Sequence, residues 1–286
     1  MTLSATLGFP RIGARRELKT AVEAHWRGDL SEPALLAEAA RLRAAHWALQ
    51  AEAGIDRIPS NDFSLYDQVL DTTAMLGAVP PRFGAVEGRV TLAQYFAMAR
   101  GTAEAPAMEM TKWFDTNYHY IVPEFTRDQS FALASRKPVE DFLEARALGH
   151  QTRPVLVGPL TWLSLGKAKE PGLDPIALLP RVLPVYAQVL RELAEAGAHW
   201  VQIDEPVLVT DLSPAQRAGF AAAYAELAQA GPKLLVATHN AGKLEEMRAL
   251  FSPHGIEVVG AAEMGLEEPV ETETSFLGNA RIKARA

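Results

Sequence analysis

Four basic residues stand close together near the start of the chain, at Arg11, Arg15, Arg16 and Lys19. They follow a short apolar segment that reads as a strand, and they surround the predicted start of a helix. Cations at a helix N-terminus oppose the helix dipole, so this arrangement indicates a site for an anion. The alternative is an ordinary solvated helix start, because surface charges contribute little to stability.

A second group combines a cation with aromatic rings in the segment MTKWFDTNYHY at 110–120. Its members are Lys112, Trp113, Phe114, Tyr118, His119 and Tyr120. An aromatic surface beside a cation suits a flat heteroaromatic ligand that carries carboxylates. The alternative is that these rings belong to the core.

Two adjacent carboxylates, Asp204 and Glu205, end the segment VQIDEP. Neighbouring residues on a strand face opposite ways, so the two would form a general acid/base pair only if the chain turned at Pro206. The spacing favours a role in fixing the loop. His150, His199 and the other histidines have no metal-ligand spacing, so structural roles are expected for them.

The elements that position these groups alternate between periodic helices and short apolar strands. Helices are predicted at 15–27, 33–53, 65–76, 92–100, 138–148 and 175–196. Strands are predicted at 5–9, 55–59, 108–112, 131–134, 155–157, 201–203, 234–237 and 256–259. Such alternation predicts an α/β fold with a parallel sheet, and its length suits a closed (β/α)8 TIM-like barrel. A doubly wound open sheet is the alternative.

The helix at 175–196 has the clearest pattern. Asp174 is in place for an N-cap, Pro175 suits the first turn and Gly197 is expected to end the helix. Its apolar residues recur at helical spacing, at Val182, Val185, Tyr186, Val189, Leu190 and Leu193.

Composition limits the classes of function. The 286 residues, 48% of them hydrophobic, suffice for one large or two ordinary domains. The net charge of −7 opposes general binding to nucleic acid or anionic membranes. With no cysteine, the chain has no disulfide, thiolate nucleophile or sulfur-ligated zinc. The apolar tract at 154–166 is too short to span a bilayer and the start lacks a signal pattern, so a cytoplasmic location is expected.

The first 232 residues resemble the N-terminal barrel of cobalamin-independent methionine synthase. The resemblance rests on LGFPRIGARRELKTAVEAHWRGD, AGIDRIPSNDFSLYDQVL, EMTKWFDTNYHYIVPEF, RPVLVGPLTWLSLGK and WVQIDEPVL, in that order. This family of methyltransferases transfers a methyl group from 5-methyltetrahydropteroyltriglutamate to homocysteine in methionine biosynthesis. The resemblance implies that the folate polyglutamate tail contacts Arg16, Glu17, Leu18, Lys19 and Lys112.

The resemblance also implies that two barrels bind different ligands. In the family, zinc and homocysteine are held by the C-terminal barrel, through His, Cys, Glu and Cys ligands. Because this chain has no cysteine, we expect it to bind folate without a zinc site of its own and without completing methyl transfer alone.

Residues 233–286 resemble the first part of the inosine/xanthosine triphosphate pyrophosphatases. The resemblance rests on KLLVATHNAGKLEEMRALF and the residues that follow it. It implies phosphate binding by the loop Thr238, His239, Asn240, Ala241, Gly242 and Lys243. Glu271 matches a glutamate associated with magnesium, although Glu273 stands where a glycine is usual. The family's catalytic aspartate would lie beyond Ala286, so pyrophosphatase activity is not expected.

The sequence therefore predicts two parts, 1–232 and 233–286, joined at a string that both families share. Recombination and a wrong join in sequence assembly would both produce such a junction. In the barrel hypothesis the foreign segment supplies the last one or two strands. The alternatives to a folate-binding barrel are a nucleotide-binding fragment and a non-functional chimera.

Overall fold

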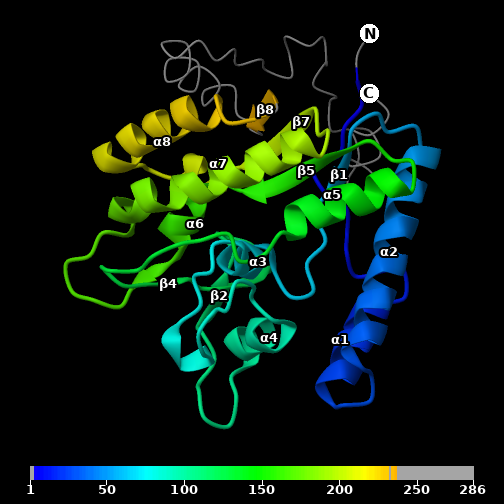
Figure 1. Cartoon of the computed structure of the whole chain (residues 1–286), viewed down its shortest axis with the longest axis horizontal. Helices are drawn as coiled ribbons and strands as arrows, with labels where there is room; N and C mark the ends of the chain where they lie inside the picture. The colour runs from blue at the N-terminus through cyan, green and yellow to red at the C-terminus, as the bar shows by residue number, and fades with distance from the viewer. Residues whose placement is uncertain (1–2, 232, 237–286) are drawn as a thin grey trace. The chain divides into compact units, whose positions relative to one another are not determined.

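A four-stranded parallel sheet is the centre of the computed structural model, which describes residues 3–231 and 233–236 (Figure 1). Its strands are β1 (Ile58–Ser60), β5 (Thr152–Val157), β7 (Trp200–Asp204) and β8 (Lys233–Val236), in the order β1-β5-β7-β8. Ile58 lies opposite Thr152, Val155 opposite Gln202, and Trp200 opposite Lys233. An isolated parallel bridge joins Ala5 to Arg57. These segments belong to one compact unit, Ser4–Ala237.

The order of the strands in the sheet follows their order in the chain. From the Ala5 bridge through β1, β5 and β7 to β8 there is no reversal of direction. A doubly wound sheet reverses at a switch point, whereas the strands of a (β/α) barrel follow one another in sequence. The mixed α/β fold is thus confirmed and the order is of the barrel type. Within the described residues the sheet is open, and the strand predicted at 256–259 lies outside them.

Three predicted strands of the sheet are not observed as such. At 5–9 the chain forms only the isolated bridge at Ala5 and no strand. Residues 131–134 form no strand, because Ala134 bonds instead to the end of a helix and to a loop: its N–H donates to the Met75 carbonyl at 2.9 Å and its carbonyl accepts from Val90 N–H at 2.9 Å. The strand predicted at 108–112 exists as β2 (Met110–Lys112), but it pairs antiparallel with β3 (His119–Ile121) in a separate hairpin. Short apolar runs carry too little periodicity to show which sheet they join.

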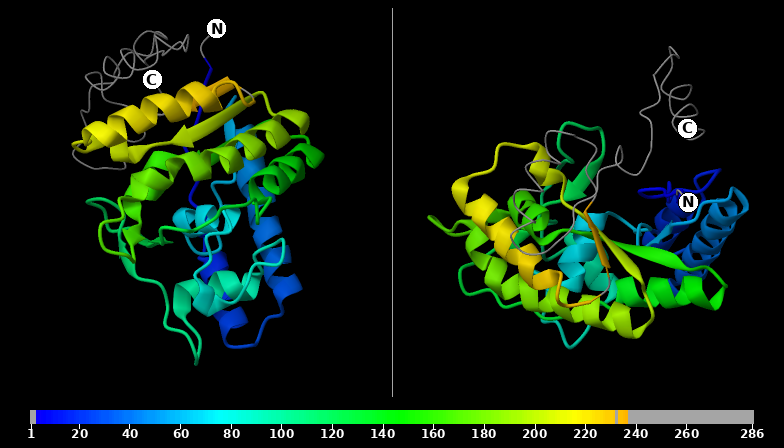
Figure 2. Two further views of the ribbon diagram at one scale, coloured as in Figure 1. Left: turned by 60° about the vertical axis from the view of Figure 1, so that its left-hand side comes forward. Right: turned by 90° about the horizontal axis from the view of Figure 1, so that it is seen from above.

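The helices lie near their predicted places. The predicted set is observed as α1 (Glu17–Trp26), α2 (Glu32–Glu52), α3 (Gln68–Met75), α4 (Leu92–Arg100), α5 (Lys137–Ala147) and α7 (Leu179–Glu195). Two helices were not predicted, α6 (Pro159–Leu165) and α8 (Pro214–Leu227). A short parallel pair, β4 (Glu124–Phe125) and β6 (Lys167–Ala168), and three 3₁₀ turns, η1 (Pro81–Phe83), η2 (Pro175–Leu178) and η3 (Pro206–Val209), complete the described elements. Figure 2 shows α5, α7 and α8 side by side along the sheet.

Helix α7 is buried along one face and bonds to the end of a sheet strand. All six apolar residues of its predicted pattern are buried, and the Tyr186 hydroxyl donates to the carbonyl of Val157 at 2.6 Å, at the end of β5. The Asp174 carboxylate accepts from Ile176 N–H at 3.1 Å, so it caps the short 3₁₀ turn η2 that leads into the helix. Gly197 takes a φ of +90° just after the helix, a conformation that glycine adopts without strain. In the described residues no helix has the length and apolarity needed to cross a membrane.

Candidate functional site

A cavity of about 510 Å³ lies at the carboxyl ends of the parallel strands. Residues at or just after the ends of β1, β5 and β7 line it, together with the loop before α1 and the loop of the β2–β3 hairpin. Its polar lining includes Arg11, Asn61, Asp62, Tyr118, Lys137 and Asp204. The volume is typical of a small-molecule site, and this edge of a parallel sheet is where ligands bind in such folds.

Arg11 ties the loop before α1 to the hairpin. One of its terminal nitrogens donates to the Tyr118 hydroxyl at 3.2 Å and the other donates to the carbonyl of Tyr66. Its guanidinium carbon lies 5.6 Å from the centre of the Tyr118 ring. Burial raises the pKa of Tyr118 to about 12, so this hydroxyl stays protonated. The structure thus brings together two of the segments that the sequence indicated.

Some residues of the aromatic group line the cavity and others belong to the core. Trp113 and Tyr118 line the cavity. Tyr120 is buried and donates to the Leu165 carbonyl at 3.0 Å, so its role is structural. Phe114 packs edge-on against Trp113, with a left-handed φ of +50° that is unusual for a bulky residue. His119 is exposed at the hairpin and lies opposite Lys112.

The cations at the start of α1 are exposed and do not line this cavity. Arg16 is exposed, takes a left-handed φ of +64° at the N-cap and makes no side-chain cap. The side chain of Lys19 is 47% exposed and forms an ion pair with Glu23 at 3.6 Å. Glu17 accepts from Arg15 N–H at 2.8 Å; backbone hydrogen bonds of this kind lower its pKa. Leu18 is buried in the core.

The predicted tail-binding residues therefore do not share one cavity. Arg16, Glu17, Leu18, Lys19 and Lys112 are all absent from the lining of the 510 Å³ cavity. Lys112 is exposed on β2, and the cations at the start of α1 are exposed on the neighbouring loop. Any tail site built from them would lie on the surface outside the cavity.

Asp204 and Glu205 diverge. Asp204 lines the cavity and accepts from Gln202 Nε2 at 2.6 Å, and burial raises its pKa to about 6. The Glu205 carboxylate turns the other way and accepts from the N–H groups of Leu160 and Thr161 at 3.1 and 2.6 Å. It fixes the start of α6, so the loop-fixing role is confirmed for Glu205, while burial raises its pKa to about 7.

Among the polar residues of the cavity that the sequence analysis missed are Asn61, Asp62 and Lys137. Asn61 has a left-handed φ of +61°; its Nδ2 donates to the Val155 carbonyl at 2.7 Å and its Oδ1 accepts from Lys137 at 2.8 Å. Asp62 accepts from Phe9 N–H at 2.7 Å, and burial raises its pKa. The sequence feature that could have identified Asn61 and Asp62 was the polar run Ser60, Asn61 and Asp62, which directly follows a predicted apolar strand.

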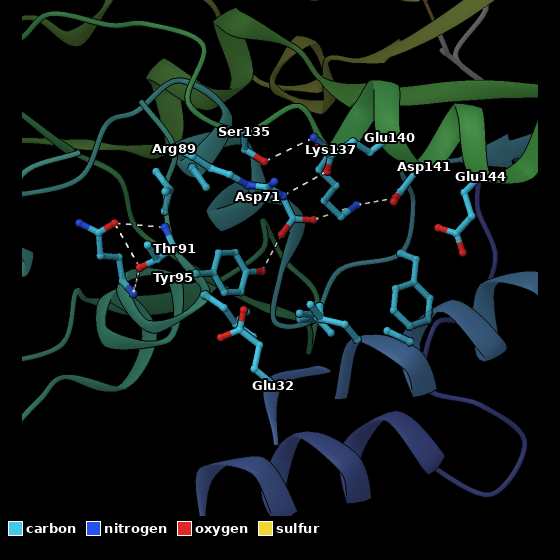
Figure 3. A pocket seen from close by; sticks show the side chains of 18 of the residues that line it. Glu32, Asp71, Arg89, Thr91, Tyr95, Ser135, Lys137, Glu140, Asp141 and Glu144 are labelled. Carbon is cyan, nitrogen blue, oxygen red and sulfur yellow. Dashed lines mark hydrogen bonds and ion pairs between the residues drawn. The ribbon is translucent and has the colours of Figure 1, made fainter. Parts of the chain in front are cut away.

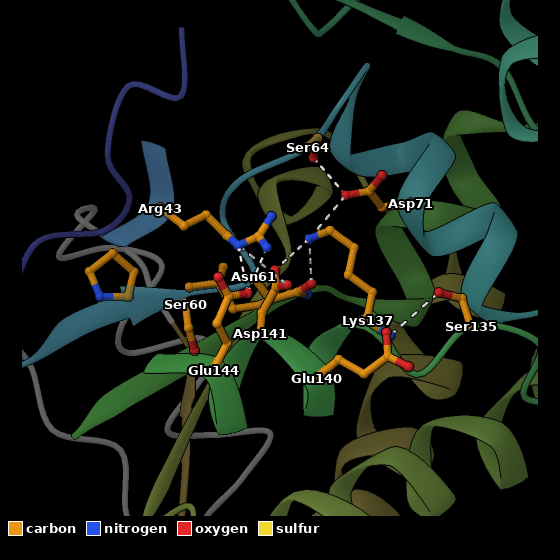
Figure 4. Close-up of polar contacts among 12 residues, drawn as sticks. Arg43, Ser60, Asn61, Ser64, Asp71, Ser135, Lys137, Glu140, Asp141 and Glu144 are labelled. Carbon is orange, nitrogen blue, oxygen red and sulfur yellow. Dashed lines mark hydrogen bonds and ion pairs between the residues drawn. The ribbon is translucent and has the colours of Figure 1, made fainter. Parts of the chain in front are cut away.

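The ammonium of Lys137 is held by three partners, as Figure 4 shows. Besides Asn61, it contacts Asp141 at 2.9 Å and Asp71 at 3.4 Å. Burial favours the neutral amine, but the two carboxylates outweigh it and raise the pKa of Lys137. Lys137 is therefore a charged structural group of the cavity wall.

A second, larger cavity of about 870 Å³ lies beyond this group, among residues of α2, α4 and α5 (Figure 3). Lys137 and Asp71 line both cavities and form a partition between them. Asp71 is fixed there by the hydroxyls of Tyr95 at 2.6 Å and Ser64 at 2.7 Å. Arg16, Lys19 and Lys112 do not line this cavity either.

Potential metal ligands are scattered over the described part of the chain. Across residues 3–231 and 233–236, no three His, Asp or Glu side chains are grouped to hold a metal ion, and the sequence has no cysteine. The described residues thus do not fit the zinc that the resemblance implied for the full-length family. The predicted nucleotide loop Thr238–Lys243 and Glu271 lie outside the described residues.

Comparison with known proteins gives consistent matches. A family model described as the N-terminal domain of cobalamin-independent synthase matches residues 3–262. A protein of Mesorhizobium japonicum is 58% identical over 250 residues, which cover 81% of this chain and 32% of that protein. A protein of Nitrobacter winogradskyi is 57% identical over 251 residues, with 81% and 33% covered. A protein of Caulobacter vibrioides is 53% identical over 264 residues, with 85% and 34% covered. Each is named 5-methyltetrahydropteroyltriglutamate–homocysteine methyltransferase, and the chain spans about a third of its length.

Proposed function

Because this chain belongs to the family of cobalamin-independent synthase N-terminal domains, we propose that it binds the triglutamate tail of 5-methyltetrahydropteroyltriglutamate. The relatives named above carry that substrate in their names. The proposed contacts are Arg16, Glu17, Leu18, Lys19 and Lys112. The observation that carries the proposal is the exposed pair of cations at the start of α1, Arg16 and Lys19.

The geometry of α1 supports an anionic partner. The N-terminus of a helix offers N–H groups and a positive dipole end to a carboxylate. The left-handed N-cap Arg16 leaves this end without a side-chain cap. Lys19 stands in the first turn, and the bond from Arg11 to Tyr118 holds the hairpin that carries Lys112 against the same loop. The carboxylates of a polyglutamate tail would contact these cations one after another. Leu18 would contribute only its backbone.

The proposed role is binding without methyl transfer by this chain alone. Its residues do not provide the zinc ligands on which the family's transfer to homocysteine depends, since cysteine is absent from the sequence. Homocysteine would meet the folate only where a zinc-bearing barrel is supplied. We propose that this function is cytoplasmic, as methionine biosynthesis is.

The tail proposal is tested by calorimetric titration of the full chain with the triglutamate and monoglutamate forms of 5-methyltetrahydrofolate. We expect the triglutamate to bind more tightly and Lys19→Ala or Lys112→Ala to weaken it by about fivefold each, the effect of one exposed ionic contact. Lys169→Ala is the matched control, because its side chain is 46% exposed and its ion pair with Glu124 measures 3.4 Å. Equal affinity for the two forms would contradict the proposal.

We also propose that the sheet belongs to a (β/α)8 barrel whose last one or two strands come from the segment 233–286. Support comes from the sequential strand order and from the parallel pairing of β8 with β7. The proposed boundary between 1–232 and 233–286 rests on the change of sequence resemblance at that point. The family match extends further, to residue 262, and so includes the loop predicted to bind nucleotide. No observation on the described residues favours nucleotide binding.

The junction is tested at the protein level. A Glu-C digest of source cells should yield LAQAGPKLLVATHNAGKLE, residues 227–245, if the joined chain is a gene product. If mass spectrometry finds only peptides that continue each parent family, the joined chain is not a gene product. The binding proposal would then apply to residues 1–232 alone.

A further inference from the structure

The two faces of the β2–β3 hairpin differ in what they contact. Trp113 and Tyr118 line the 510 Å³ cavity. Lys112 and His119, the residues next to them in the chain, are exposed and do not line it. Successive side chains of a strand point to opposite faces. Lys112 and His119 therefore share the outer face of the hairpin, where the register places them directly opposite each other.

The hydrogen bonds of the hairpin bring these two side chains close together. Trp113 N–H donates to the Tyr118 carbonyl at 2.7 Å, so these two residues form a hydrogen-bonded pair. Bonded and non-bonded pairs alternate along antiparallel strands, which makes the next pair, Lys112 and His119, a non-hydrogen-bonded one. The Cβ atoms of such a pair are about 4.5–5.5 Å apart. This spacing allows the ammonium and the imidazole to contact the same carboxylate.

No acidic side chain of the hairpin neutralises this pair. Within residues 3–231 and 233–236, neither Lys112 nor His119 forms an ion pair. The Glu109 carboxylate contacts Lys167 at 2.6 Å, and Asp115 is exposed in the turn. Like charges directly opposite each other on a hairpin are unfavourable. A protonated His119 beside Lys112 would therefore be stabilised by an anion that lies between them.

The imidazole of His119 has one nitrogen left for such an anion. Its Nδ1 lies 3.1 Å from the carbonyl oxygen of Asn117, a contact that requires a proton on Nδ1. In the neutral ring Nε2 then carries no proton and has nothing to donate to a carboxylate, whereas in the charged ring both nitrogens donate. A carboxylate that binds at Nε2 must therefore bind together with a proton.

We infer that Lys112 and His119 form one carboxylate subsite for the triglutamate tail, and that His119 takes up a proton from the solvent when the tail binds. This inference rests on the proposed function, because the ligand is the same tail. It adds a second residue of the hairpin to the site, and a dependence on pH in the range where histidine changes its charge. An anion beside an imidazole favours the charged ring, and the charge-assisted hydrogen bond is stronger than a neutral one.

Proton uptake is measured by calorimetric titration of the full chain with the triglutamate form of 5-methyltetrahydrofolate, at pH 7 in two buffers of different ionisation enthalpy. We expect the wild type to take up more protons on binding than His119→Gln does. At pH 6 His119→Gln should bind the triglutamate about three- to fivefold more weakly than the wild type, the effect of one exposed ionic contact. At pH 8 the two proteins should bind it equally.

Two further variants make the result specific. His119→Arg carries a permanent charge, so at both pH values it should bind the triglutamate as tightly as the wild type does at pH 6, without the extra proton uptake. His199→Gln is the matched control, because His199 is also exposed but precedes the amino end of β7, whereas the cavity lies at the carboxyl ends of the strands. This control should behave as the wild type.

Equal proton uptake by the wild type and His119→Gln, or equal triglutamate affinity of the two at pH 6, would overturn the inference. If Lys19→Ala and Lys112→Ala weaken binding and His119→Gln does not, the inference alone fails and the tail proposal stands. If the wild type binds the triglutamate no better than the monoglutamate form, the tail proposal fails and the inference fails with it.

Discussion

Asp62 and Asp204 occupy comparable places, since each lies where a parallel strand ends and each has lost most of its contact with water. Both strands were predicted to end one residue early, at Ile203 where the strand ends at Asp204 and at Pro59 where the strand ends at Ser60. Only Asp204 was singled out from the sequence, since two adjacent carboxylates stand at the end of its strand. Asp62 lies two residues beyond the end of β1 and has no carboxylate beside it, so the same rule was not applied to it.

The raised pKa of Asp204 makes a testable contribution to stability. Its carboxyl has an ordinary pKa of 3.8 when exposed and about 6 in the folded chain, so folding favours the protonated form. This contribution is present below about pH 4 and is lost as the pH rises through about 6. Between pH 4 and pH 7 the free energy of unfolding should fall by about 2 kcal/mol more in the wild type than in Asp204→Asn.

Urea unfolding at several pH values, with the slope of each transition compared, measures this difference. Parallel pH profiles for the two proteins would show that the Asp204 carboxyl titrates at the same pH in both the folded and the unfolded chain.

Among the elements, helices were predicted well where their burial pattern was long. Helix α7 has a broad apolar face, and α4 has a capping box in which Thr91 and Gln94 bond to each other's backbone. Helix α6 was missed because its residues read as one apolar tract without periodicity, and its start depends on a carboxylate far along the chain, Glu205. Gly158 is also needed there, since a Cβ at this position would lie 2.1 Å from Glu205 Cδ. A cap supplied from forty-five residues away leaves no local signal.

The hairpin shows the opposite error. Its chemistry was predicted, in that Trp113 and Tyr118 reach the cavity, although β2 was assigned to the wrong sheet. The residues that line a site can thus be recognised by their types while their supporting element is misread. Lys112, by contrast, is on the same hairpin but is not among the residues that line the cavity.

At the scale of the whole molecule, the apolar strands predicted a parallel α/β sheet, and that is observed. Within the described residues fewer of the predicted strands join this sheet, because the connection from β1 to β5 carries α3, α4, the hairpin and α5 before the chain returns to the sheet. Sequence periodicity shows where chain segments are extended but does not report their partners.

That long connection has a consequence for how the chain reaches its native state. Ile58 must find Thr152 across some ninety residues, whereas Trp200 pairs with Lys233 across a single helix. Closing a longer loop costs more entropy and slows the search, so β7 and β8 should associate before β1 docks on β5. Pulse-labelled amide exchange during refolding should show early protection in β7 and late protection in β5 at its contacts with β1. Simultaneous protection would mean that the sheet forms in one concerted step.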